Sequence, residues 1–175
     1  FITGATGSNI ILDHADNVFT SAVTMKADTG GNEAFGNITF VDSADVKLHS
    51  SASTGGDLFL DGSTDGAVGG NLSITATTGN ITQGVALAVT GTSTFITGAT
   101  GSNIILDHAD NAFSSWVKME ADDGSEAFGD ITFVDSGAVV IQTSAATDAD
   151  GELLIDAGTD GAVGGNLSIT ATTGN

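Results

Sequence analysis

Aspartates that follow short apolar runs are the side chains in this sequence whose spacing could support chemistry. They are Asp13, Asp16, Asp42, Asp45, Asp61 and Asp65 in the first half, and Asp107, Asp110, Asp135, Asp156 and Asp160 in the second. We expect the first six to lie at one aligned corner of three successive turns of the chain, and the others to repeat that corner. Stacked carboxylates about 5 Å apart repel each other by about 1 kcal/mol per pair in water. A hard divalent cation such as Ca²⁺, which prefers oxygen ligands, would relieve that repulsion.

The same aspartates also have a purely structural interpretation. Asp at a turn hydrogen-bonds nearby backbone N–H groups and faces water. The sequence has neither an EF-hand loop nor a glycine-rich calcium repeat, and DADGE at 148–152 matches an EF-hand loop only in part. His14 and His108 occupy equivalent places in the segment DHADN, but no second histidine recurs at ligand spacing, so we assign them no metal. A calcium site and a solvated turn are therefore both open.

Two further features could contact a ligand. Trp116, the single tryptophan, stands where the first half has Ala22, and alternation with Val117 and Met119 predicts that it points outward. An exposed indole can stack on a sugar or on a neighbouring molecule, although lone exposed aromatics also occur without a role. Threonine pairs of the T-x-T type can bind ice when every turn carries one, but most turns here lack them. We interpret them as strand formers on a solvated face.

An internal repeat determines the architecture that would position these residues. Residues 1–17 recur letter for letter at 95–111, an offset of 94 residues, and residues 64–80 recur at 159–175, an offset of 95 residues. The sequence thus divides into a first long repeat, 1–94, and a second, truncated one, 95–175, which we expect to form one continuous rod. The segment 81–94, ITQGVALAVTGTST, has no second occurrence. We expect the chain to be a window from a longer array.

Short apolar alternations inside each long repeat follow Gly-Asn or Ser-Asn pairs, as in SNIIL (8–12), GNITF (36–40) and GNLSI (70–74). Period-two alternation after turn residues is typical of β-strands. The spacing of these segments predicts an all-β fold, a parallel β-solenoid with about four coils per 94-residue repeat. The general preference of parallel crossovers makes it a right-handed β-helix. Each repeat would advance about 19 Å along the rod.

Alternation also predicts which side chains form the core. By parity, the inward residues are Ile10, Leu12, Phe19, Val23, Met25, Ile38, Phe40, Val46, Leu48, Leu58, Leu60, Leu72 and Ile74. Stacks of such residues on successive strands would make a thin continuous core. The asparagines that start the strands should form a side-chain ladder along the same axis.

The charge of the chain excludes several classes of partner. Three lysines face 22 acidic residues, which gives a formal net charge of −19. Nucleic acid is not expected as a partner, because phosphate binding needs clustered Lys or Arg. An anionic membrane surface is disfavoured for the same reason, and no apolar segment is long enough for membrane insertion. The acidity favours solubility, divalent cations or a saline exterior.

Catalysis is not expected either. The fold predicted above can carry polysaccharide lyases, but these need a cationic group and a base, usually Arg or Lys. The chain has no arginine, and Lys26, Lys47 and Lys118 lie at positions that differ between the repeats. Glycosidases need one pair of carboxylates in a cleft, whereas duplicated turns offer no unique pair. Repetition of this kind favours a structural role.

The segments GNITF–VDSAD, GNLSITATTGNITQ and ALAVTGTSTFITGATG resemble the repeat regions of large secreted bacterial surface proteins of the filamentous-haemagglutinin and autotransporter-adhesin kind. The resemblance covers essentially the whole chain and lies in composition and period. It implies a right-handed parallel β-helix that holds adhesive tips away from the cell.

We therefore expect a structural or adhesive β-solenoid, secreted to the cell surface, that forms a stiff stalk or a surface filament. Its partners would be neighbouring repeats or copies of itself, joined end to end or laterally, with host or environmental glycans as further candidates. The alternative is a binding module that depends on Ca²⁺ or contacts glycans. A carbohydrate-active enzyme and an ice-binding protein are weaker alternatives.

Overall fold

Every regular element that the structure describes is a β-strand. The structure is a computed structural model, and it describes residues 1–5, 7–27, 36–49, 57–60, 67–121, 129–142, 152–155 and 165–173. Within these ranges there are strands β1 to β18 and no helix, so none of the described segments is a helix that could cross a membrane. All pairings between the described strands are parallel. The prediction of an all-β, parallel architecture is confirmed.

The strands form two large sheets and one small sheet. The eight-stranded sheet has the order β1 (Ile2–Thr3), β3 (Val23–Ala27), β6 (Asp57–Leu60), β5 (Val46–His49), β9 (Ile81–Gln83), β12 (Ile104–Leu106), β15 (Ile131–Asp135) and β18 (Leu167–Ala171). The seven-stranded sheet has the order β16 (Val140–Gln142), β17 (Glu152–Ile155), β14 (Val117–Ala121), β11 (Ser93–Thr97), β8 (Leu72–Ala76), β4 (Ile38–Asp42) and β2 (Ile10–Leu12). The small sheet has the order β13 (Ala112–Phe113), β10 (Ala88–Val89) and β7 (Ala67–Val68).

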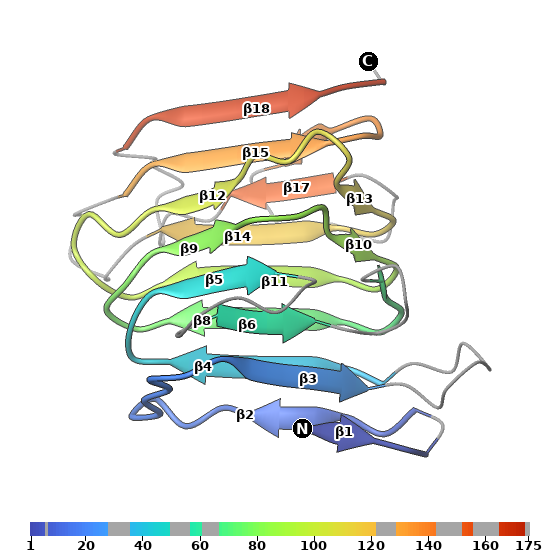
Figure 1. Cartoon of the computed structure of the whole chain (residues 1–175). Helices are drawn as coiled ribbons and strands as arrows, with labels where there is room; N and C mark the ends of the chain where they lie inside the picture. Colours follow the sequence, from blue (N-terminus) through green and yellow to red (C-terminus); the bar gives the residue numbers. More distant parts are fainter. Residues whose placement is uncertain are drawn as a thin grey trace.

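The two large sheets lie face to face, and the strands of one point opposite to the strands of the other (Figure 1). The chain passes from one sheet to the other: β2 belongs to the seven-stranded sheet, β3 to the eight-stranded one, β4 to the first again and β5 to the second. The small sheet lies along the edge where the chain returns to the seven-stranded sheet. At the usual strand spacing of about 4.8 Å, the eight strands of the longer sheet span about 34 Å.

Period-two alternation places one apolar core between the two sheets. Of the residues predicted to point inward, Leu12 and Phe19 are partly buried against this core, and all the others are buried. Aromatic rings bridge successive strands: Phe113 lies 6.2 Å from Phe95 and 5.4 Å from Phe133, measured between ring centroids. The predicted core is confirmed, and it runs without interruption from the first repeat into the second.

Equivalent strands of the two repeats lie in opposite sheets. β2 and β12 have the same sequence, IIL, yet β2 lies in the seven-stranded sheet and β12 in the eight-stranded one. The same exchange separates β4 from β15 and β8 from β18. It arises because seven passes between the sheets lead from β2 to β12, and an odd number of passes ends on the other face. Each large sheet nevertheless gains four strands per repeat: β2, β4, β8 and β11 in one sheet, and β3, β6, β5 and β9 in the other.

One strand of each repeat accounts for the odd number of passes. β6 follows β5 in the chain but stays in the same sheet, where it lies between β3 and β5. Its counterpart in the second repeat, β17, lies in the same way between β14 and β16, but in the other sheet. Figure 1 shows β17 next to β14. Each repeat therefore inserts one extra strand, and the two repeats insert it on opposite faces.

Candidate functional site

The aspartates singled out from the sequence do not form one row. Asp13 and Asp16 follow β2, and Asp42 and Asp45 lie at and after the end of β4, so these four lie where the chain leaves the seven-stranded sheet. Their counterparts Asp107, Asp110 and Asp135 lie where the chain leaves the eight-stranded sheet. Because the strands of the two sheets point in opposite directions, these are opposite edges of the stack (Figure 1). We expected the aspartates of both repeats to share one corner of the stack. In the structure they occupy two corners, at opposite ends of the strands. Asp61, Asp65, Asp156 and Asp160 lie outside the described residues.

Most of these carboxylates face water. Asp13, Asp16, Asp45, Asp107 and Asp110 are all exposed. In each DHADN turn the backbone N–H of the second aspartate donates to the histidine Nδ1 at 3.2 Å, and the carboxylate lies 3.9 Å from the same nitrogen. These contacts are local to the turn and leave the carboxylates solvated. Among the described residues, no group of three or more His, Asp or Glu side chains could hold a metal ion.

Asp42 and Asp135 differ from the others because both are buried, with only 2% of each residue exposed. The Oδ1 atom of Asp42 accepts from the backbone N–H groups of Phe19 and Ala44, both at 3.4 Å. The Oδ1 atom of Asp135 accepts from Phe113 at 3.4 Å and from Gly137 at 3.3 Å. Both carboxylates therefore hold the chain at the end of a strand.

The electrostatic state of Asp135 follows from its burial. Desolvation raises the pKa of the Asp135 carboxyl above its ordinary value, and hydrogen bonds from the backbone of Gly137, Phe113 and Ser136 oppose this rise. A single carboxyl with a raised pKa could serve as a general acid. Here, however, its acceptor atom is engaged by the backbone of its own turn and of the strand below, which is a structural role.

Trp116, the other predicted contact residue, is only partly exposed. It immediately precedes β14, and its backbone carbonyl accepts a hydrogen bond from the Ser93 N–H at 3.0 Å. The register of β11 and β14 places Trp116 beside Thr92, and the register of β8 and β11 places Thr92 beside Asn71. Trp116 therefore continues the row of strand-starting residues of this sheet. It therefore stands at a corner of the stack as a half-covered side chain.

The ladder of strand-starting asparagines is present in the structure. In the seven-stranded sheet, each side-chain Oδ1 accepts from the backbone N–H of the next strand: Asn9 from Asn37 at 2.8 Å, Asn37 from Asn71 at 2.9 Å, and Asn71 from Thr92 at 2.9 Å. The expected ladder is confirmed, with the difference that the donors are backbone groups and not side-chain amides. It satisfies N–H groups at a corner where the chain bends out of the sheet.

A second ladder follows the eight-stranded sheet and includes two aspartates. Oδ1 of Asp45 accepts from the Asn80 N–H at 2.6 Å, Asn80 from Asn103 at 2.8 Å, Asn103 from Asp130 at 2.7 Å, and Asp130 from Asn166 at 2.7 Å. Asp45 was predicted as a possible cation ligand. In the structure its carboxylate forms the first step of this ladder, and it also accepts from the side-chain amide of Asn80 at 3.2 Å.

Glycines before the ladder residues allow the backbones of successive strands to approach each other closely. A Cβ atom added to Gly36 would overlap the backbone carbonyl of Ser8, and one added to Gly70 would overlap that of Gly36. In the other ladder a Cβ on Gly129 would overlap the carbonyl of Ser102. The Gly-Asn pair is therefore a corner motif: the glycine permits the contact and the asparagine satisfies the next strand.

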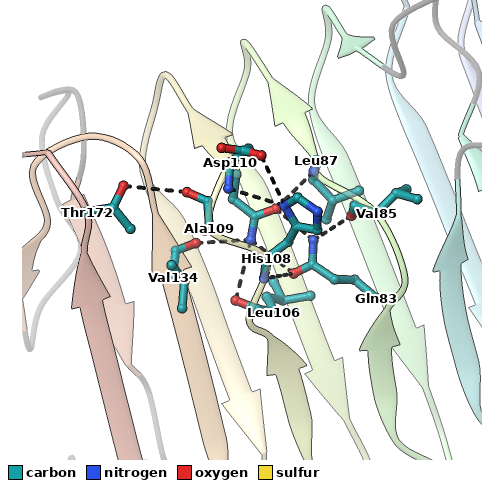
Figure 2. A network of polar contacts seen from close by, with 10 residues as sticks. Gln83, Val85, Leu87, Leu106, His108, Ala109, Asp110, Val134 and Thr172 are labelled. Atoms are coloured by element: carbon teal, nitrogen blue, oxygen red, sulfur yellow. Dashed lines mark hydrogen bonds and ion pairs between the residues drawn. The ribbon is translucent and has the colours of Figure 1, made fainter.

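Sequence reasoning missed a buried amide pair that links the end of the first repeat, at Gln83, to the second repeat, at Asn111. Asn111 has no exposed surface, and its side chain exchanges two hydrogen bonds with the Gln83 amide, at 2.7 and 2.9 Å. Figure 2 labels its partners Gln83, Leu87, Leu106 and Val134. Asn111 also accepts from the Leu87 N–H at 2.9 Å and donates to the carbonyls of Val134 at 3.0 Å and Leu106 at 3.4 Å. The only available signal was that Asn111 ends a segment repeated without change.

The first repeat has a weaker version of this network. Asn17, the counterpart of Asn111, is partly exposed and donates to the carbonyls of Leu12 at 3.4 Å and Val41 at 3.3 Å. The hydrogen bonds of the Asn17 side chain to described residues go to backbone carbonyls and include no side-chain amide. The chain thus contains the same asparagine with and without its amide partner.

Taken together, the polar groups of the described residues satisfy the corners of a stack of strands. Their hydrogen bonds run along the stack, from one strand to the next, and do not converge on a cavity. Such an arrangement fixes the register of successive strands.

Comparison with known protein families gives a match for part of the chain. A family model described as "Repeats of unknown function (DUF5649)" matches residues 35–120, from just before β4 to the end of β14. No curated protein and no solved structure matches the chain. The match supports the conclusion that this is a repeat region.

Proposed function

We propose that this chain forms a parallel β-solenoid rod with a structural or adhesive role, as a stiff stalk or surface filament outside a bacterial cell. The observation that carries the proposal is the continuity of the core and of the two ladders. One cluster of buried apolar residues extends from Ile10 to Phe133, and the ladders extend from Asn9 to Thr92 and from Asp45 to Asn166. The two repeats thus share one folded unit.

The physics of such a rod favours a mechanical role. Every strand is held to its neighbours by a parallel backbone ladder and by side chains stacked in the core. Length then follows the number of repeats, and stiffness follows from hydrogen bonds that point along the axis. The net charge of −19 keeps neighbouring rods apart in solution. Extracellular location and the absence of catalysis belong to the same proposal, supported by the family resemblance and the repetition of every acidic turn.

Its partners would be neighbouring repeats or further copies of the chain. Strand edges at the ends of a stack carry unpaired N–H and C=O groups, which pair readily with another strand. Glycan contact through Trp116 is a weaker alternative, because this side chain is only partly exposed.

Electron microscopy of chains with two, four and six copies of the 94-residue repeat tests the rod. The expected particles are straight and of constant width, and they lengthen by about 19 Å per repeat. Compact particles or flexible beads would contradict the proposal. Thermal unfolding with and without EDTA gives the second readout: the rod requires equal unfolding temperatures, whereas a large drop in EDTA would favour the Ca²⁺-dependent module.

A further inference from the structure

Large apolar side chains are exposed at the two ends of the stack. At the end formed by β1 and β2 they are Phe1, Ile2, Ile11 and Val18; at the end formed by β16 and β18 they are Val140, Ile141 and Leu167. These are all the exposed large apolar residues in the described part of the chain. Exposed apolar side chains beside unpaired strand edges indicate a surface that another strand covers.

The strand β18 shows what that covering strand is. β8 and β18 have the same sequence, LSITA, but Leu72 of β8 is 1% exposed and Leu167 of β18 is 42% exposed. The difference is that β11 covers β8, with Phe95 beside Ile74 and Ile96 beside Thr75. At the end of the stack, β18 therefore exposes the strand edge that residues 93–97 cover in its counterpart β8.

The opposite end of the stack carries the complementary sequence. β1 lies in the segment FIT of residues 1–3, which is identical to residues 95–97 of β11. β18 and β1 thus have the sequences of β8 and β11, two strands that already pair in this chain.

The other sheet defines what must accompany this pairing. β16 is the counterpart of β5, and β2 is the counterpart of β12; inside the chain, β9 lies between β5 and β12. A further copy that follows the same order would place one β9-type strand between β16 and its own β2. The seven-stranded sheet would then have eight strands, as the other sheet does. Residues 81–94, which occur once in the sequence, supply that strand.

We propose that the end of the stack at β16 and β18 is a docking surface for a further copy of the repeat, which enters through a segment with the sequence of residues 81–97. Residues 81–83 of that segment pair with β16, and residues 95–97 pair with β18. This deepens the proposed function and rests on it. In each new copy, every strand lies in the sheet opposite to that of its counterpart in the previous copy. The structural period is therefore two repeats, and the extra strand of each copy alternates between the two sheets. Equal strand numbers on the two faces keep the rod straight.

Pyrene excimer fluorescence tests the pairing, because the chain contains no cysteine. Residues 81–97 are appended after Asn175, and pyrene is attached through Thr170→Cys and through Ile96→Cys in the appended segment. Thr75 and Ile96 are partners inside the chain, and Thr170 is the counterpart of Thr75. We expect strong excimer emission that urea abolishes. A matched control moves the second cysteine to Thr82→Cys in the appended segment, which the proposal places on the opposite sheet, and this pair should give little excimer.

Absence of excimer from the first pair, or equal emission from both pairs, would overturn the proposal. A second measurement needs no label: the appended segment should raise the urea midpoint of unfolding, and the same segment with Phe95→Asp should not. An unchanged midpoint would also count against docking. Failure here is distinct from failure of the proposed function, since long chains could still form rods by a different pairing, and the docking could occur in chains that form no rod.

Discussion

The buried amide of Asn111 offers the sharpest test of how the strands are held together. Asn111→Ala removes five hydrogen bonds and leaves the Leu87 N–H and the Val134 carbonyl without this side-chain partner. The Gln83 amide keeps only its contacts with the Val85 carbonyl and the His108 N–H. A buried polar group that loses its partner costs about 1–3 kcal/mol. Some of this is recovered as the Gln83 amide reorients, so we expect a loss of about 4 kcal/mol in the free energy of unfolding.

The chain contains its own control for this substitution. Asn17→Ala changes the same residue in the same local sequence, but it removes only two long hydrogen bonds at a partly exposed site. The expected loss is about 1 kcal/mol. Urea unfolding followed by the fluorescence of Trp116, the single tryptophan, measures both values, with circular dichroism as an independent probe.

Equal losses for Asn17→Ala and Asn111→Ala would refute this reasoning, because they would show that the Gln83 pair adds nothing. A double-mutant cycle with Gln83→Ala isolates the pair itself. We expect a coupling energy of about 1–3 kcal/mol between the two amides. A coupling near zero would assign the loss to the backbone contacts alone.

Three further substitutions test other parts of the account. Burial raises the pKa of Asp135, so the folded state holds this proton more tightly than the unfolded chain, and the contribution of the group to stability is lost as pH rises above about 4. Asp135→Asn should therefore flatten this fall in stability, and Asp107→Asn, at an exposed site, should leave it unchanged. Gly129→Ala should cost at least about 3 kcal/mol, because its Cβ would overlap a backbone carbonyl, whereas Gly4→Ala, with open space around it, should stay within about 0.5 kcal/mol in the same urea titration. The Ser93 hydroxyl is buried without a hydrogen-bond partner, so Ser93→Ala should raise the free energy of unfolding by about 1 kcal/mol, and a decrease would show that the hydroxyl is satisfied.

The strands and the core could be predicted from the sequence because both depend on local alternation. Period two identifies inward residues such as Met25 and Leu48 regardless of how the strands are ordered. The ladder could be predicted for a similar reason: an asparagine recurs at the start of several strands, and parallel stacking brings successive copies together.

The exchange of faces between repeats could not be predicted in this way. It depends on β6 remaining in the same sheet as β5, which is a property of tertiary pairing. Nothing in the DLFL segment distinguishes it from a strand that crosses to the other sheet. Because this single strand changes the number of passes from even to odd, the acidic turns of the two repeats separate to opposite edges.

The candidate site shows the same limit. Asp42 and Asp13 both follow apolar strands in the sequence, yet Asp42 is buried and Asp13 is exposed. Their difference comes from the neighbouring strand: the backbone of Phe19 lies over Asp42 and donates to it. Likewise, the Gln83–Asn111 pair joins residues 28 positions apart in sequence, and only the register of β9 and β12 brings them together.

The distance between spin labels at Asp13→Cys and Asp107→Cys tests the central claim most directly. These exposed positions are equivalent in the two repeats, and the chain has no other cysteine. If seven passes separate the repeats, the labels lie on opposite sides of the stack, at the two ends of the strands. Pulsed electron–electron double resonance should then give a distance of about 30 Å. If each repeat completed whole turns, the labels would lie one above the other at about 20 Å, and that result would contradict the account.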